Sequence, residues 1–570
     1  MSPRAVRAAD LPDRTIRRRR DAEAIVSAVL IAAFAAFLVL FVLYPMLTVL
    51  ARSLQDGQGR FVGLANYARY FASPAIAASV TNSLAVAITT TVITVTLAFA
   101  YAYALTRTAM PWRGAFRLIA LLPLFAPSLV QGIAFVYVFG NNGLLTRWTG
   151  VNVGIYGFKG IVAAETFYCF PHAMLLLVAA LGAADARLYD AANALGASRV
   201  KRFVTVTLPG AKFGLMSACV VVFTTVITDF GIPKVIGGKY SVMATEIYNQ
   251  VIGQQNFTMG ATVSVVLLVP AALAMVVDRL VQRRQQALVA ASSVPLRPAR
   301  ARLRDAALFA YTALVAAAIL GIYLVVLVSS LVRRWPYDFT PTVKHYAFDT
   351  VGGSTAIVNS VQAAALAAVA GTVLAFAGAY LVEKRPSLMS GPLYALAVLP
   401  VSIPGMVLGL AYIFTFNAPG SPLNLLYGTL ALLAISHLVH YFTVPFLTAT
   451  TALKQMDREL EHVSASLGVP FYRTFWRITV PVALPSIVAI SMYLFLNAMV
   501  TLSAAVFLVA PGTELAAVAV LLMDDAGDTA QAAAMSVLII AVGLGVRLVY
   551  ALVMRGVTRR TQAWTTAARG

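Results

Sequence analysis

About twelve apolar segments, each long enough to cross a lipid bilayer, constrain this chain more than any other feature. The first six lie near 24–52, 82–105, 115–140, 158–184, 211–232 and 258–278. The second six lie near 305–332, 357–382, 392–415, 428–451, 483–510 and 530–554. Hydrophobic residues make up 60% of the 570 residues and charged residues only 11%, which is far from soluble globular usage. The sequence therefore predicts an all-α integral membrane protein with about 12 transmembrane helices.

The net charge of +21 raises the possibility of a nucleic-acid partner, but the placement of the arginines argues against one. They gather in short segments beside apolar spans, as expected for segments kept on the cytoplasmic side of a membrane. These arginines are Arg14, Arg17, Arg18, Arg19, Arg20, Arg279, Arg283, Arg284, Arg297, Arg300, Arg302, Arg304, Arg555, Arg559 and Arg560. We expect a multi-pass membrane protein, surrounded by lipid, with both termini cytoplasmic and the first span retained as an anchor.

The two sets of six spans are copies of one another. At one constant offset in the numbering, the repeated pairs include Asn82-Ser83 with Asn359-Ser360, Leu97-Ala98-Phe99-Ala100 with Leu374-Ala375-Phe376-Ala377, and Leu122-Pro123 with Leu399-Pro400. Further along the chain the offset in the numbering is slightly smaller. It equals the difference between Gly196 and Gly468 and is constant from there on. Because each copy holds an even number of spans, both enter from the same side and form two parallel six-helix repeats. The predicted organisation is a basic tail (1–22), a first half (23–278), a linker (279–304), a second half (305–556) and a cytoplasmic tail (557–570).

One polar loop in each half has the same unusual spacing of glycine, a β-branched residue and proline. The first reads Asp190-Ala191-Ala192-x3-Gly196-x9-Val206-Thr207-Leu208-Pro209. The second reads Glu461-His462-Val463-Ser464-x3-Gly468-x9-Ile478-Thr479-Val480-Pro481. A single loop of this kind is equally well explained as an amphipathic helix that returns the chain to the membrane. Two copies in register favour a function, because independent loops rarely share their spacing over twenty positions.

The loop residues predict a compact helical turn. A glycine just past a helix can adopt the left-handed conformation that redirects the chain, which is the role expected for Gly196 and Gly468. Proline suits the first turn of the helix that follows. We also expect small residues to allow close approach of another surface, and the phenylalanines to offer apolar anchors for a pocket in a partner. The residues concerned are Pro209 and Pro481 (proline), Ala191 and Ala192 (small), and Phe203 and Phe475 (aromatic).

This repeated motif resembles the E-A-A-x3-G-x9-I-x-L-P loop of binding-protein-dependent ABC importer permeases. The resemblance extends over nearly the whole chain. It implies a type I permease fold with both halves fused in one chain, placed in a bacterial inner (plasma) membrane. It also implies a periplasmic substrate-binding protein and two copies of a separate ATPase subunit that dock on these loops. ATP and Mg would belong to that ATPase. The second loop departs from the family pattern, because His462-Val463-Ser464 replaces Glu-Ala-Ala and the carboxylate is shifted to Glu461.

The chain shows no catalytic or metal-binding pattern of its own. A P-loop requires Gly-x4-Gly-Lys followed by a hydroxyl residue, and the nearest fragment, Gly237-Gly238-Lys239-Tyr240, lacks the first glycine and the hydroxyl. The five histidines have no zinc or haem spacing, and the two cysteines give no disulfide framework. We therefore predict no enzyme activity, no metal and no cofactor in this chain.

Carboxylates mark two further candidate sites. Glu165 falls within the fourth span and Asp229 near the outer end of the fifth, and ionisable residues inside a membrane are candidates for a solute pathway. The alternative is a structural carboxylate paired with a neighbour. Asp524, Asp525 and Asp528 precede the twelfth span on the expected outer face. They are candidates for docking the binding protein or for gating, or else they form a solvated loop.

The substrate rests on resemblance alone. The runs 228–238, 250–257 and 520–528 look like those of fused permeases assigned to 2-aminoethylphosphonate uptake. Similar fused permeases are assigned to ferric iron, and others in the wider family to thiamine or polyamines. An ion-coupled secondary transporter also has internal repeats and midplane carboxylates. A transporter of that class has no reason to keep two Gly-Pro loops.

Overall fold

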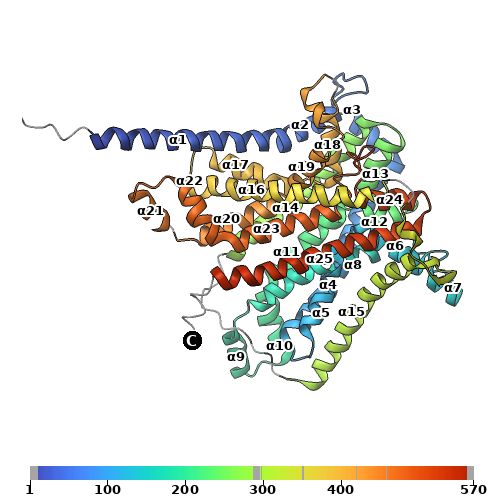
Figure 1. Cartoon of the computed structure of the whole chain (residues 1–570). Coiled ribbons are helices and arrows are strands. Elements are labelled where there is room, and N and C mark those ends of the chain that lie inside the picture. Colours follow the sequence, from blue (N-terminus) through green and yellow to red (C-terminus); the bar gives the residue numbers. More distant parts are fainter. Residues whose placement is uncertain are drawn as a thin grey trace, which may run out of the picture.

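The computed structural model describes residues 11–286, 296, 298, 300–348, 352–418, 420–457 and 459–561. In this part of the chain nearly every ordered element is a helix, and the one sheet is an antiparallel hairpin of β1 (Val332–Arg334) and β2 (Asp338–Pro341). Ten helical segments are long and apolar enough to cross a membrane, and two bent helix pairs raise the number to twelve if each pair is one span. The all-α membrane fold is confirmed (Figure 1).

The helices follow the two sets of spans. The first half contains α1 (Leu11–Leu38), α2 (Tyr44–Ser53), α3 (Ala65–Ala72), α4 (Pro74–Arg107), α5 (Arg113–Ile119), α6 (Ser128–Phe139), α7 (Leu144–Thr149), α8 (Phe158–Gly182), α9 (Ala186–Ala194), α10 (Arg199–Arg202), α11 (Leu208–Thr228), α12 (Gly231–Ile236), α13 (Met243–Tyr248) and α14 (Phe257–Gln286). The second half contains α15 (Arg302–Leu331), α16 (Thr355–Lys384), α17 (Ser390–Val398), α18 (Gly405–Phe416), α19 (Leu430–His440), α20 (Thr443–Gln455), α21 (Glu459–Ser466), α22 (Phe471–Thr474), α23 (Val480–Val500), α24 (Ala516–Asp525) and α25 (Thr529–Thr561).

The third span of each half is broken, where the sequence predicted one continuous helix. In the second half, α17 with its 3₁₀ extension meets α18 at 114°. In the first half, α5 and α6 are separated by a 3₁₀ turn at Leu122–Phe125. Both breaks fall on the repeated Leu-Pro pair and the next proline, Pro127 or Pro404. Proline lacks the amide hydrogen that a helix interior needs and disfavours a helical residue before it, so two prolines at this spacing end the helix.

Three other spans also differ from the expectation. The fourth span of the second half bends by 57° between α19 and α20, whereas its counterpart α8 runs unbroken through Pro171. The fifth spans end at Thr228 and Val500, earlier than the predicted 232 and 510. The chain then folds back into short elements, which include α12, α13 and α24. These elements line the end of the molecule opposite the two repeated loops (Figure 1).

The two halves exchange their first spans. The segment α1–α2 packs against the second half, where the Phe34 ring lies 6.2 Å from that of Phe442 and Tyr412 Oη donates a hydrogen bond of 2.9 Å to the Phe41 carbonyl. In return α15 packs against α4, α5 and α6, and Tyr311 Oη donates a hydrogen bond of 2.7 Å to the Leu97 carbonyl. The halves are therefore interlocked units and not two separate bundles joined by a linker.

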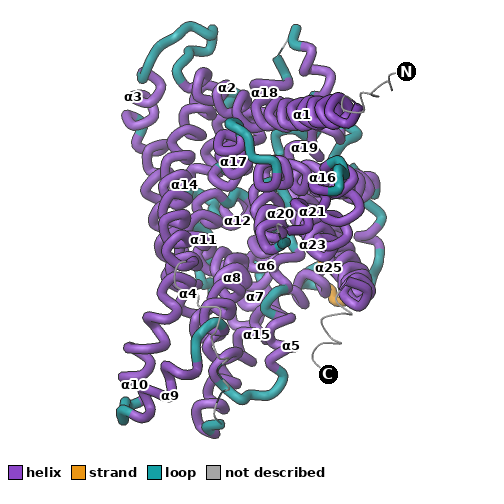
Figure 2. Tube along the Cα trace, turned by 90° about the vertical axis from the view of Figure 1, so that its left-hand side faces the viewer, coloured by secondary structure: helices purple, strands orange, loops and turns teal. Residues whose placement is uncertain are grey.

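Several helices extend beyond the predicted boundaries of the two halves. α1 begins at Leu11 inside the expected tail 1–22, α14 continues to Gln286 and α25 to Thr561. Residues 1–10, 287–295, 297, 299 and 562–570 of the expected tails and linker lie outside the described residues. Figure 2, which views the molecule from the end where α1 projects, shows α9, α10 and α21 on that end.

Candidate functional site

The two repeated loops fold in the same way. In each, a short helix ends at a glycine in the left-handed region, with φ +67° at Gly196 and +68° at Gly468. A second short helix follows, α10 or α22, and continues through one π-helical turn, Phe203–Thr207 or Phe475–Thr479, into the fifth span. The bounds of α10 and α22, of the two π turns, and of α11 and α23 all differ by the same step in numbering as the two glycines. We call these two segments, 185–207 and 459–479, the paired knobs.

The glycine in each knob closes a helix by the Schellman arrangement, in which an amide beyond the glycine returns to a carbonyl five residues earlier. Ala197 N donates to the Ala192 carbonyl at 3.0 Å, and Val469 N donates to the Ser464 carbonyl at 3.0 Å. This geometry needs a positive φ at the residue between, which only glycine adopts without cost. The predicted role of the two glycines is confirmed by their backbone angles.

The half-buried aromatic residues Phe203 and Phe475 hold each knob onto its own half, and their expected role as anchors for a partner stays a prediction. The Phe203 ring lies 6.1 Å from the rings of Phe99 and Tyr103 on α4. The Phe475 ring contacts the equivalent residues of α16, at 5.8 Å from Phe376 and 4.9 Å from Tyr380. Aromatic pairs at this separation contribute packing energy, so these rings fix the orientation of the knobs relative to the second span.

A cation at the end of the second span makes another fixed contact with each knob. In the first half, the Arg107 guanidinium lies over the Tyr189 ring at 5.1 Å. In the second half, the equivalent Lys384 pairs with Glu461 at 3.5 Å, and the Lys384 side chain is only 6% exposed. The Glu461 carboxylate is therefore engaged within the chain. Its expected place among the residues that contact the ATPase stays a prediction.

The outer surface of each knob carries the residues that remain free to meet another protein. Asp190, Ala191, Gly196 and Pro209 are exposed in the first knob or directly after it, and Ala192 is half-buried. In and directly after the second knob, His462, Gly468 and Pro481 are exposed. Asp190 therefore presents a carboxylate where its repeat partner His462 presents an imidazole.

Exposed apolar side chains on the knobs were missed by the sequence reasoning. Leu195 is 86% exposed and its repeat partner Leu467 is 74% exposed, both next to the turning glycine. Val204 and its partner Trp476 are also exposed. Large apolar side chains in matched exposed positions indicate a contact surface. The constant offset between the two loops was the available signal, since it pairs each of these residues with its counterpart.

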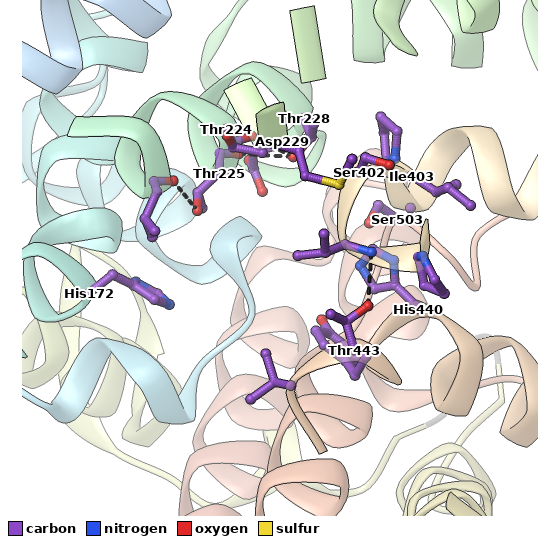
Figure 3. A pocket seen from close by; sticks show the side chains of 18 of the residues that line it. His172, Thr224, Thr225, Thr228, Asp229, Ser402, Ile403, His440, Thr443 and Ser503 are labelled. Atoms are coloured by element: carbon purple, nitrogen blue, oxygen red, sulfur yellow. Dashed lines mark hydrogen bonds between the residues drawn. The ribbon is translucent and has the colours of Figure 1, made fainter. Parts of the chain in front are cut away.

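A cavity of about 400 Å³ lies between the two halves. Its first-half wall comes from α8, α11 and α14, and its second-half wall from the broken third span, the α19–α20 bend, Tyr493 and Ser503. Figure 3 shows His172, Thr224, Thr225 and Asp229 on one side of it, facing Ser402, Ser503, His440 and Thr443 on the other. The broken third span and the α19–α20 bend, both in the second half, thus place backbone and polar side chains on the cavity surface.

Of the two predicted pathway carboxylates, the structure places one on the cavity wall and the other behind it. Asp229 lines the cavity at the end of α11 and accepts a hydrogen bond of 2.9 Å from Ile232 N. Glu165 is fully buried, and its Oε2 lies 3.9 Å from Cys169 Sγ. Their repeat partners differ. His437 is 1% exposed, and Thr501 donates a hydrogen bond of 2.9 Å to Tyr441 Oη.

The acidic residues before the last span join the two halves at the end opposite the knobs. Asp525 pairs with Lys234 of α12 at 3.2 Å, and Lys234 also lies 5.1 Å from the centre of the Tyr248 ring. Tyr248 in turn stacks at 6.2 Å on Phe507 of the second half. Asp525 is therefore part of a contact between halves, and docking through it would require this ion pair to open.

Asp524 should make the stability of this contact depend on pH. Burial, together with the charge of Asp525, raises the pKa of the Asp524 carboxyl to about 6, and Lys234 acts in the opposite direction. The phenols of Tyr137 and Tyr156 also lie within reach of its charge. Because the folded-state pKa is raised above that of an unfolded aspartate, ionisation costs stability as pH rises from about 4 through 6. We expect the unfolding midpoint of the purified protein to fall over that interval.

The matched variants are Asp524→Asn and Asp528→Asn. Asp524→Asn should flatten the fall of the unfolding midpoint with pH, whereas Asp528→Asn, the same chemical change in the following turn, should retain it. Thermal unfolding in detergent from pH 4 to 8 measures both. An equally steep fall in wild type and Asp524→Asn would contradict the assignment.

No group of three or more His, Cys, Asp or Glu side chains among the described residues could hold a metal ion. His437 and His440, one helical turn apart, are no exception. The expectation that this chain has no metal site and no catalytic residues stays a prediction.

Comparison with known proteins finds the same family in both halves of the chain. The family model described as "Binding-protein-dependent transport system inner membrane component" matches twice, over residues 97–287 and 367–560. A ferric transport system permease protein, FbpB of Actinobacillus pleuropneumoniae, is 26% identical over 532 residues, which cover 90% of this chain and 76% of the relative. A putative ferric transport system permease protein, FbpB 1 of Haemophilus influenzae, is 25% identical over 83% of this chain and 76% of the relative. Among solved structures, a bacterial alginate ABC transporter covers 49% of this chain and 99% of its own, at 16% identity and a TM-score of 0.39.

Proposed function

Because the chain belongs to the family of binding-protein-dependent transport system inner membrane components, we propose that it is the translocation subunit of an ATP-driven importer of ferric iron. As a member of that family it is a multi-pass permease of the inner membrane. ATP is proposed as the energy source because of the two knobs. They share their backbone geometry and lie on one end of a single chain (Figures 1 and 2). One chain then supplies both of the docking positions that a dimer of smaller permeases would supply.

In this proposal each knob receives one copy of a separate ATPase subunit on the cytoplasmic side, and ATP and Mg stay on that subunit. Leu195 and Leu467 would enter an apolar recess of the ATPase, and Asp190 would supply a carboxylate at the position where the second knob has His462. ATP binding would draw the knobs together and rock the interlocked halves, which would open the end where Lys234 meets Asp525. A periplasmic substrate-binding protein would deliver its cargo at that end. Both chain termini would be cytoplasmic.

Ferric iron is the cargo favoured by the names of the relatives, which cover most of this chain. The sequence runs near 228–238, 250–257 and 520–528 led instead to 2-aminoethylphosphonate, with iron as the alternative. Thiamine and polyamines belong to the same wider set of substrates. The preference for iron over phosphonate is a proposal. Uptake measured with both substrates side by side distinguishes the two cargoes.

Uptake into proteoliposomes tests the proposal. The permease is reconstituted with its ATPase and binding protein, and labelled ferric iron and labelled 2-aminoethylphosphonate are supplied side by side. We expect ferric uptake that requires both ATP and binding protein, and no uptake driven by a proton or sodium gradient without ATP. Gradient-driven uptake would favour an ion-coupled transporter and overturn the mechanism. ATP-driven uptake of 2-aminoethylphosphonate alone would keep the mechanism and remove iron as the cargo.

A further inference from the structure

The cavity between the halves has a wall of unusual charge. Among the described residues that line it, none is lysine or arginine. The polar groups on its surface are two carboxylates, two imidazoles, three phenols and several hydroxyls. They belong to Asp229, Asp278, His172, His440, Tyr168, Tyr441, Tyr493, Thr224, Thr225, Thr228, Thr443, Ser402 and Ser503. A phosphonate or another anion in this space would meet carboxylates and find no cationic partner, and a buried anion without one is costly.

Asp229 is the charge that both halves share. The Asp229 carboxylate lines the same cavity as Tyr168 of the first half and Tyr441 of the second. Tyr441 receives a hydrogen bond from Thr501 and its ring lies 6.2 Å from that of Tyr493. The carboxylates of the wall thus come from the first half, and the second half contributes the phenols of Tyr441 and Tyr493.

These groups suit a hard cation that passes through and is released. Carboxylate and phenol oxygens with imidazole nitrogens are the donors that a small, highly charged metal ion accepts. They are spread over both walls, and no three His, Cys, Asp or Glu side chains of the described residues come close enough to hold a metal. Conduction requires a site that attracts an ion without trapping it, and scattered donors meet that requirement.

We propose that this cavity is the translocation site for a bare hard cation, with Asp229 supplying the attracting charge and the phenols of Tyr441 and Tyr493 the oxygen contacts of the opposite wall. The inference rests on the proposed function, because ferric iron is the cation that would use the site. It adds that the permease contacts its cargo directly, through residues that differ between the two halves.

Three variants test the site in the reconstituted complex of permease, ATPase and binding protein. Asp229→Asn removes the charge, Tyr441→Phe removes one phenol oxygen, and Asp338→Asn in the exposed β1–β2 hairpin serves as the carboxylate control. Iron taken up and ATP hydrolysed are measured together with ferric-loaded binding protein. We expect Asp229→Asn to lower the iron transported per ATP by about tenfold or more, since a charged contact is lost. Tyr441→Phe should lower it less, and Asp338→Asn should match wild type.

The ATPase readout keeps the outcomes distinct. Binding-protein-stimulated ATP hydrolysis should stay near the wild-type rate in both cavity variants, because the knobs are unchanged, and this also shows that the variants are folded. If wild type imports iron and both cavity variants import it equally well per ATP, the cavity inference is wrong and the proposed function stands. If Asp229→Asn fails to assemble, Tyr441→Phe alone decides the point. If wild type shows no ATP-driven iron uptake, the proposed cargo fails, and the inference fails with it.

Discussion

Gly196→Pro and Gly468→Pro should each abolish ATP-driven uptake while the protein still inserts in the membrane. The two glycines hold φ at +67° and +68°, and proline is confined to about −65°, so the helix-closing turn cannot form. The amide hydrogen of Gly196 is also lost, and it donates to the Asn193 carbonyl at 3.0 Å. Uptake in proteoliposomes and retention of the ATPase during purification of the complex measure the effect.

Two alanine variants make this result specific to the turn. Gly196→Ala should weaken coupling only in part, because alanine in the left-handed region costs about 1–2 kcal/mol without preventing the turn. Gly210→Ala should be neutral, since Gly210 is helical and a Cβ there meets no atom within 4 Å. Wild-type uptake in either proline variant would remove the coupling function from that knob.

Gly231→Ser and Gly405→Ser should each destabilise the protein by overpacking. A Cβ on Gly231 would lie 2.7 Å from Leu129 N and closer still to Ser128 Oγ. A Cβ on Gly405 would lie 2.9 Å from Ser503 Cβ and 3.0 Å from Ala504 N. Overpacking of this kind costs about 1–3 kcal/mol, which should appear as a lower unfolding midpoint in detergent.

The repeat supplies a rescue for this defect. Position 128 corresponds to 405 and position 231 to 503, so each half places one serine against one glycine, in opposite order. Adding Ser128→Gly to Gly231→Ser copies the arrangement of the second half and should restore part of the lost stability. The rescue is partial because Leu129 N remains close. A double variant whose loss equals the sum of the two single losses would show that the two positions are independent.

How far sequence reasoning reached depends on the range of the interactions involved. The spans, their repeat and the turning glycines were predictable, because hydropathy, proline and positive-φ turns act over a few residues. The contact of Phe203 with Phe99 and Tyr103 was not predictable, because it joins segments that are distant in the sequence. The broken third span was also missed, although Pro127 and Pro404 marked it in both copies.

The sequence by itself determined that this protein is a membrane-embedded, internally duplicated helical chain with two matched knobs, because bilayer burial and backbone preference are local constraints. Only the tertiary structure decided that the halves exchange their first spans, that Glu461 is neutralised by Lys384, and that Asp229 faces a cavity made by both halves. Each of these depends on which helices become neighbours. That choice follows from the summed packing of many side chains distant in sequence, and no short motif records it.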